Sequence, residues 1–225
     1  MSHFRWSSGV CTHKGNVRER NEDAALDGGD SGLWVVADGM GGHDRGDLAS
    51  RLLIERLADV PGSDSLDGCV MQISDAAEET NRELLNQDHG DNVSGTTMVA
   101  LTVAQGSCAC VWIGDSRAYR CRGRSIRQVT EDHTEEHGSS VLTRAIGASD
   151  YLELDVRNVA VSDGDLFVLC TDGLYSELSD QEIAELLVSS ATPQQAARRL
   201  VESARQGTGN DTVTAWVVEF EARNG

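Results

Sequence analysis

The stretch Leu33–Gly42, which reads LWVVADGMGG, decides how the rest of the sequence is interpreted. It begins as an apolar, β-branched run of strand length, which predicts a strand covered by other elements on both faces. It ends in Asp38, followed by three glycines within four residues. We expect the chain to leave the sheet there through a turn, because glycine adopts positive φ and permits close backbone approach. An aspartate at the end of a rigid strand is well placed to hold a hard cation, although Asp-Gly is also a common surface-turn pair.

Helical periodicity follows this strand and returns near the end of the chain. Leucines at helical spacing predict a helix over Asp47–Val60, and the same pattern predicts a second one over Leu66–Leu84. The turn at 61–63 indicates that these two helices form an antiparallel pair. Two short helices are predicted later, because Ser179 begins a capping box and Thr192 precedes a proline at the first helical position.

Strands account for most of the remaining chain. A short strand is expected from Val10, followed by a charged loop that ends at Asp23. Further strands are predicted at Gly95–Val103, Cys108–Ile113, Arg117–Cys121, Ser125–Val129, Leu152–Val161, Leu166–Cys170 and Thr212–Phe220. We expect a turn at 163–165 to join the two strands that flank it.

The order of these elements predicts the fold class. Two helix pairs alternate with antiparallel strands, which indicates an α+β domain with sheets stacked at the centre and helices outside. The chain has 225 residues, only two prolines and no Ser/Gly-rich tract that would serve as a linker. We therefore expect one domain over residues 1–225.

Composition excludes several partners and indicates a compartment. The net charge of −18 argues against nucleic acid or an anionic membrane as the main partner, and solubility is its simplest explanation. The six cysteines form no C-x-x-C pair and mostly lie in apolar runs, which is typical of reduced, buried thiols. The N-terminus lacks the apolar core of a signal peptide, and no apolar run is long enough to span a bilayer. A cytoplasmic protein is expected.

Four aspartates occupy strand boundaries. Asp38, Asp115 and Asp172 each follow a strongly apolar strand, and Asp211 precedes the last one. If these boundaries meet at one rim, the rim is strongly anionic and requires protons or cations. Oxygen ligands without Cys or His favour Mg²⁺ or Mn²⁺ over zinc, and two such ions roughly 3.5–4 Å apart activate a shared water toward phosphate esters. Arg18 could grip the phosphate, or it could simply pair with neighbouring acids at the surface.

Five ordered segments then carry a resemblance to a known family. They are Arg18–Asp23, Asp38–His43, Gly114–Arg117, Leu142–Gly147 and Thr171–Leu174. In residues and order they resemble the motifs of PPM-type (protein phosphatase 2C-like) metal-dependent Ser/Thr phosphatases, over about residues 9 to 218. The resemblance implies a β-sandwich with a helix pair on each outer face, giving α-β-β-α layers. It also implies dephosphorylation of phosphoserine and phosphothreonine in protein substrates, in opposition to a cognate Ser/Thr kinase.

The resemblance implies a metal centre of named residues. Asp38 would bridge two Mn²⁺ or Mg²⁺ ions, and the carbonyl of Gly39 would bind one of them. Asp172 and Asp211 would complete the shell of the other ion. Asp115 with Asp172 resembles the site of a third, looser ion in bacterial relatives. The nucleophile would be a metal-bound water, so that no covalent phospho-enzyme forms.

The resemblance also implies roles for the early charged segment. Arg18 would hold the substrate phosphate. Asp23, and more weakly Glu22, would orient waters bound to the metals. Arg18, Asp38, Asp172 and Asp211 are therefore the expected catalytic residues.

Three positions depart from the family pattern. Met40 stands where many eukaryotic relatives have a histidine that is a proposed general acid, and His43 is a candidate replacement for which a structural role is favoured. Thr212 replaces the usual asparagine after the last metal aspartate. The segment Glu135–Val141 is shorter than the usual flap, which predicts an open active site and places small bacterial members of the family nearest.

Two alternatives stay open at this point. A non-catalytic member would keep the fold to bind phosphoproteins, but it should have lost metal aspartates, and all four are present. The same metals in an open site would also suit the hydrolysis of small phosphate esters.

Overall fold

Two antiparallel sheets form the centre of the molecule in the computed structural model, which describes residues 4–41, 45–87, 94–135 and 141–223. The first sheet has the strand order β1 (Phe4–His13), β11 (Val213–Ala222), β10 (Asp165–Cys170), β7 (Arg117–Arg122) and β8 (Ser125–Gln128). The second has the order β2 (Asp23–Gly28), β3 (Leu33–Gly41), β5 (Met98–Ala104), β6 (Ser107–Ile113) and β9 (Asp155–Val159), and β4 (Ser94–Thr96) pairs with β3.

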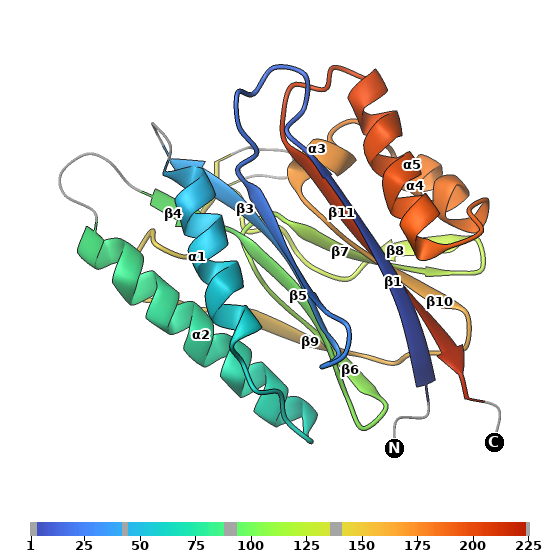
Figure 1. Cartoon of the computed structure of the whole chain (residues 1–225), viewed down its shortest axis with the longest axis horizontal. Helices are drawn as coiled ribbons and strands as arrows, with labels where there is room; N and C mark the ends of the chain where they lie inside the picture. Colours follow the sequence, from blue (N-terminus) through green and yellow to red (C-terminus); the bar gives the residue numbers. More distant parts are fainter. Residues whose placement is uncertain (1–3, 42–44, 88–93, 136–140, 224–225) are drawn as a thin grey trace.

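Helices cover the outer face of each sheet (Figure 1). The pair α1 (Gly46–Ala58) and α2 (Leu66–Gln87) packs on the second sheet, and α4 (Asp180–Val188) with α5 (Pro193–Gln206) packs on the first. The one-turn helix α3 (Asp172–Tyr175) follows β10 directly. The predicted α+β fold with α-β-β-α layers is confirmed. Of the helices formed by described residues, none is long and apolar enough to cross a bilayer.

The core consists of three apolar layers, and β3 contributes to two of them. Trp34 and Val36 lie between the sheets with Phe167, whereas Val35 and Ala37 face the helix pair α1–α2. All four β3 side chains are fully buried, as the apolar run predicted. Burying an aromatic side chain of this kind contributes on the order of 2 kcal/mol or more, so the intersheet layer holds the two sheets in fixed register.

The glycine-rich end of β3 differs from the predicted turn. The strand continues through Asp38 to Gly41, because Gly39 to Gly41 pair with β4. A Cβ on Gly39 would lie 1.9 Å from the carbonyl oxygen of Gly46, so only glycine allows α1 to begin so close to the strand. Asp38 therefore lies within a strand rather than at its end. Its backbone is held by pairing with β2, and the residues that follow it pair with β4.

Other differences arise where local pattern says little about pairing. Strand β1 begins at Phe4, six residues before the predicted start, since all ten of its residues pair with β11. Strand β2 was missed, and it begins at Asp23, which the sequence assigned to a loop. Strands β9 and β10 follow one another in the chain but belong to different sheets, so the segment between them is not the turn of a hairpin.

The C-terminal helices largely agree with prediction. The capping box of α4 is present, with Ser179 and Glu182 each bonding the other's backbone N–H. Helix α5 has 14 residues and is not short, and the single turn α3 was missed. All six cysteines are free, and five of them are buried, which agrees with their interpretation as reduced core residues.

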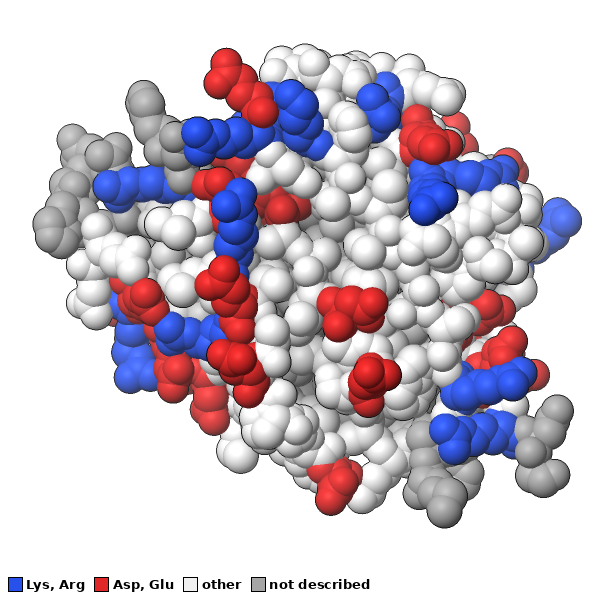
Figure 2. Space-filling view, viewed as in Figure 1, with Lys and Arg blue, Asp and Glu red and all other residues white. Residues whose placement is uncertain are grey.

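Figure 2 shows Lys and Arg side chains interspersed with Asp and Glu toward the edges of this face, while the middle carries separate acidic side chains among uncharged ones. The net charge of −18 is therefore not gathered into one acidic surface on this side. This distribution suits the simple explanation that the charge maintains solubility.

Candidate active site

One pocket of about 460 Å³ brings the predicted site residues together. Its lining includes residues from both sheets and from the loops that end their strands: Arg18, Glu22, Asp38, Gly39, Met40, Thr97, Asp115, Arg144, Asp172 and Asp211. The four strand-boundary aspartates thus share one cavity, although they lie up to 173 residues apart in the chain (211 − 38). Of the predicted site residues, only Asp23 is outside this lining.

Backbone contacts fix the two aspartates of the second sheet. The N–H of Asp38 donates to the hydroxyl of Thr97 at 3.0 Å, and its carbonyl accepts the N–H of Thr97 at 2.9 Å. The hydroxyls of Thr97 and Ser116 lie 2.7 Å apart, and Ser116 adjoins Asp115. Asp115 follows Gly114, which has φ of 95°, a conformation that favours glycine. This network sets the spacing between Asp38 and Asp115.

The carboxylates of the pocket destabilise one another when they are ionised. Burial raises the pKa of Asp38 well above its usual value, and the carboxylates of Asp23, Asp172, Asp115 and Asp211 raise it further. Burial, followed by Asp115 and Asp211, raises the pKa of Asp172 to about 7. Burial also raises the pKa of Asp115. A site of this kind requires bound protons or cations.

The donor chemistry fits hard divalent cations. Carboxylate oxygens line the pocket, and Oδ1 of Asp172 is buried with no hydrogen-bond partner among the described residues. Within the described residues, however, no group of three or more His, Cys, Asp or Glu side chains already has the spacing of a metal site. Arg18 occupies part of this donor set: its Nη2 lies 3.0 Å from the carboxylate of Asp211, and its Nη1 lies 3.3 Å from Glu22. Arg18 and a metal ion would compete for the same carboxylate.

Asp23 lies in the floor behind the pocket, directly opposite Asp38 in the β2–β3 ladder. Three threonine hydroxyls from the first sheet donate to its carboxylate: Thr212 to Oδ1 at 2.9 Å, and Thr171 and Thr214 to Oδ2 at 2.9 and 2.6 Å. Burial raises its pKa to about 6, and these three bonds oppose that shift. Asp23 therefore ties the two sheets together beneath the aspartates. Thr212, which departs from the family pattern, supplies one of the three ties.

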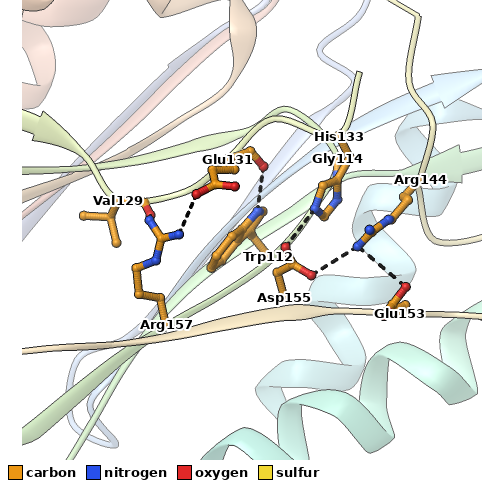
Figure 3. Close-up of polar contacts among 9 residues, drawn as sticks. All are labelled: Trp112, Gly114, Val129, Glu131, His133, Arg144, Glu153, Asp155 and Arg157. Atoms are coloured by element: carbon orange, nitrogen blue, oxygen red, sulfur yellow. Dashed lines mark hydrogen bonds and ion pairs between the residues drawn. The ribbon is translucent and has the colours of Figure 1, made fainter. Parts of the chain in front are cut away.

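A second arginine, Arg144, lines the pocket, and no role was predicted for it. Nη1 of Arg144 donates to Oδ1 of Asp155 at 3.1 Å, and Oδ2 of Asp155 lies 3.3 Å from Nε2 of His133 (Figure 3). Nδ1 of His133 accepts the N–H of Gly114 at 3.1 Å, so Nε2 carries the proton when the imidazole is neutral. Figure 3 shows His133 and Arg144 approaching Asp155 from different sides. The turn that precedes Asp115 is thus linked to an arginine of the rim.

Glu177 is a further residue that sequence reasoning missed. Its carboxylate accepts the N–H groups of Thr208 and Gly209 at 2.9 and 3.2 Å, and the hydroxyl of Thr208 also donates to it. It thereby fastens the loop that leads to Asp211 to the segment just after α3, whose first residue is Asp172. An acidic residue in a polar loop gives no sequence signal for such a clamp.

Two predicted features cannot be placed. His43 lies outside the described residues, as does most of the Glu135–Val141 segment. Met40 lines the pocket and has no ionisable group, so it does not donate a proton to a leaving group.

Comparison with known proteins decides the family. The family model described as Protein phosphatase 2C matches residues 12–217, nearly the whole chain. The chain belongs to the protein phosphatase 2C family. The resemblance predicted from five motifs is therefore confirmed.

Relatives of this phosphatase 2C chain are bacterial. The serine/threonine phosphatase stp of Listeria monocytogenes is 30% identical, over 92% of this chain and 93% of its own. The solved structure of PppA, described as a key regulatory component of T6SS in Pseudomonas aeruginosa, is 36% identical with a TM-score of 0.89, covering 97% of this chain and 98% of its own. These relatives confirm the predicted Ser/Thr protein phosphatase.

A third relative supports the metal. The catalytic domain of the serine threonine protein phosphatase PstP, solved in complex with two manganese ions, is 31% identical with a TM-score of 0.82, over 97% of this chain and 99% of its own. Metal dependence is general in the phosphatase 2C family, and Mn²⁺ is a supported metal for this member.

Proposed function

We propose that the pocket hydrolyses phosphoserine and phosphothreonine in proteins, with Asp38, the Gly39 carbonyl, Asp172 and Asp211 as ligands of two Mn²⁺ or Mg²⁺ ions. The observation that carries the proposal is the shared cavity of four aspartates, in which a buried oxygen of Asp172 has no hydrogen-bond partner in the part of the chain that the structure describes. When bound, the divalent cations lower the pKa of water and neutralise charge on the phosphoryl group. Asp115, together with Asp172, is the proposed site of a third ion.

Arg18 is the proposed phosphate-binding residue. Its side chain lies at the rim of the pocket and is 46% exposed, and its guanidinium is already held by two carboxylates. Phosphate oxygens satisfy the same planar donors, and a guanidinium can bind two of them at once. If Asp211 held a cation, the Arg18 donor that now bonds Asp211 would be available to a substrate phosphate in the pocket.

Glu22 and Asp23 are proposed to act through water. Glu22 lines the pocket, and Asp23 lies opposite Asp38 in the ladder, with its carboxylate held by threonines. A carboxylate fixed in this way presents its remaining lone pairs in one direction, which suits the orientation of a metal-bound water.

The biological setting stays a proposal as well. Phosphoproteins are the substrate class of the relatives, and we propose that this chain opposes a cognate Ser/Thr kinase in the cytoplasm as a single catalytic domain over 1–225. A direct assay measures this activity in the chain itself and compares phosphoprotein substrates with small phosphate esters.

The assay compares hydrolysis of an aryl phosphate with Mn²⁺ and with EDTA, and then release of phosphate from a phosphothreonine peptide. We expect turnover of both substrates with Mn²⁺ and none with EDTA. Full activity in EDTA would contradict the proposed mechanism. Hydrolysis of the aryl phosphate without hydrolysis of any phosphopeptide would favour a small-ester hydrolase. Absence of both activities would favour a non-catalytic binder.

A further inference from the structure

A strongly basic hairpin stands out in this acidic protein. Residues 117–128, which form β7, its turn and β8, contain five arginines and no acid, whereas the whole chain carries a charge of −18. We call this segment the arginine hairpin. Only Arg117 of the five lies close to the active site, where it stacks on Tyr175 and pairs with Asp132.

Two of these five arginines are paired with acidic side chains, and the other three have no such pairing among the described residues. Arg117 is bonded to Asp132, and Arg122 is bonded to Asp165. Arg120 donates to the carbonyl of Ala160 at 3.2 Å and has no acidic partner among the described residues. Arg124 and Arg127 are exposed, and neither makes a polar contact within the described part of the chain. The hairpin therefore has three cations that no acid of the described residues compensates.

Two of the three face each other. Arg120 on β7 is the direct cross-strand partner of Arg127 on β8, so both side chains project from the same face of the ribbon. Like charges directly opposite one another destabilise a sheet, and an anion between them would remove this cost.

The hairpin also ends in an open strand edge. β8 is the last strand of the first sheet and pairs only with β7 there. The N–H of Val129 donates to the carbonyl of Ala118. Because the pattern alternates along an antiparallel ladder, the backbone N–H and C=O groups of Ile126 and Gln128 point toward the open edge. Such an edge can accept an additional strand.

The two faces of β8 differ in chemistry. On one face lie Arg120 and Arg127, and on the other lies Ile126, opposite Cys121. The Ile126 face borders a groove of about 960 Å³ between β8 and α4, whose apolar lining includes Leu178, Leu186 and Val188. Glu182 and Glu185 stand on the α4 wall of that groove, and Arg124 and Arg199 also line it. The charges of the lining are therefore mixed, and its apolar residues suit apolar side chains.

We propose that β8 is a docking site for an extended acidic segment of a partner protein, in which acidic and apolar residues alternate. Added beside β8, such a segment would bond the backbone of Ile126 and Gln128. Its acidic side chains would lie on the face of Arg120 and Arg127, and its apolar ones in the groove under α4, because side chains alternate along a strand. The proposal concerns binding away from the metal pocket and does not depend on the proposed catalysis.

Edge protection is the competing explanation of the same arginines. Charges on an edge strand keep two copies of a sheet from joining, without any ligand. This explanation accounts for exposed Arg127 but not for its pairing with an arginine on the inner strand β7. The two explanations predict different behaviour when both arginines are neutralised.

The test measures binding of a fluorescein-labelled peptide of about eight residues, alternating Glu and Val, by fluorescence anisotropy. We expect saturable binding that weakens as salt is raised. A peptide of the same composition with its glutamates in one block, and an alternating peptide with N-methylated amides, should both bind much more weakly. Equal binding of either control peptide would overturn the proposal, since charge alone would then explain it.

Variants of the protein complete the test. The double substitution Arg120→Gln and Arg127→Gln should weaken peptide binding about tenfold, because it removes one half-buried and one exposed charge contact. The matched control Arg82→Gln, on exposed α2, should leave peptide binding unchanged, and hydrolysis of an aryl phosphate should be unchanged in every variant. Unchanged peptide affinity in the double variant would overturn the proposal.

The proposal would also be overturned if the wild type bound no peptide while the double variant self-associated on gel filtration, because the arginines would then only protect the edge. Binding of anionic vesicles that matches peptide binding would identify a membrane as the occupant and would also overturn it.

Discussion

Two aspartates of this fold have opposite surroundings. Asp165 is fully buried, and its carboxylate accepts two bonds from Arg122, at 2.7 and 2.8 Å, and one from the N–H of Ser162. Asp38 is partly exposed at the pocket, and the charges that act on it most strongly are other carboxylates. The charge of Asp165 is compensated within the chain, whereas the charge of Asp38 is left for a ligand. Compensation by the chain therefore separates a structural carboxylate from a functional one more clearly than burial does.

The largest effect is expected from Asp38→Asn. Asparagine keeps the shape of the side chain but removes the charge that would bridge two cations, so the Mn²⁺-dependent kcat/KM should fall by at least about 10²-fold. In EDTA, the same change should raise Tm, because one of the mutually repelling carboxylates is gone. Steady-state kinetics on an aryl phosphate and thermal unfolding measure the two effects.

The paired control for this prediction is Asp165→Asn. It should keep Mn²⁺-dependent activity and lower Tm in EDTA, because Arg122 loses its charged partner. If both variants shifted Tm in the same direction, the contrast between a compensated and an uncompensated carboxylate would be wrong.

Metal and pH should act together on stability. In the folded, metal-free protein the pKa of Asp172 is raised to about 7 and that of Asp23 to about 6, from an ordinary value of 3.8. For acids whose folded-state pKa is raised, the stability contribution is fully present below the unfolded pKa and is lost as pH rises through the folded pKa. Without metal, these groups should therefore lower Tm as pH increases from about 4 to about 7.

Manganese should reverse this trend. Mn²⁺ binds the ionised carboxylates, so the rise in Tm that it causes should be small near pH 5 and large near pH 8. A metal in hundredfold excess over its Kd stabilises a protein by about 2.7 kcal/mol. Thermal unfolding across this pH range, with Mn²⁺ and with EDTA, measures the effect. A rise in Tm that does not depend on pH would show that the raised pKa values do not belong to the metal ligands.

Arg18→Ala extends the comparison from the carboxylates to their arginine partners. A metal ion could replace Arg18 as the partner of Asp211, whereas Arg122 is the permanent partner of Asp165. Loss of the phosphate-binding guanidinium should raise KM for a phosphothreonine peptide about tenfold, with little change in kcat. Binding of Mn²⁺, measured by calorimetry, should become somewhat tighter, since Asp211 is no longer held. A decrease in kcat alone, at unchanged KM, would contradict the assigned role.

The sequence was sufficient to predict the carboxylates that follow strong strands. Asp38, Asp115 and Asp172 each end an apolar run, and the fold brings these ends to one rim. Strands β3 and β6 run in the same direction because one antiparallel strand, β5, lies between them, and β10 ends at the same pocket from the other sheet. The motif order then identified the family. These predictions rest on local residue patterns, which can be recognised in a single sequence.

Sequence could not predict what depends on pairing between distant segments. Strand β2 is short and half polar, so its pairing with β3 left no periodic signal, and Asp23 was placed in a loop. The separation of β9 and β10 into different sheets depends on which neighbours complete each layer. Glu177 and His133 position the loops of the site through backbone groups, and backbone contacts leave no trace in residue type.

The smallest effect is expected from Arg122→Ala, and it tests the structural side of the comparison. Among the described residues, removing the guanidinium leaves the Ser162 N–H as the donor to the buried carboxylate of Asp165. Because the side chain of Arg122 is 47% exposed, water replaces part of what its guanidinium supplied, so Tm should fall by only about 3 °C. Arg5→Ala is the matched control, because the Arg5–Glu221 pair is exposed on both sides and should contribute almost nothing. Thermal unfolding should give the same decrease in Tm for Arg122→Ala with and without Mn²⁺, because the charge of Asp165 is compensated by the chain and not by the metal. If Mn²⁺ restored the Tm of Arg122→Ala, the metal pocket and this distant ion pair would be coupled. The contrast between the compensated carboxylate of Asp165 and the uncompensated one of Asp38 would then be wrong.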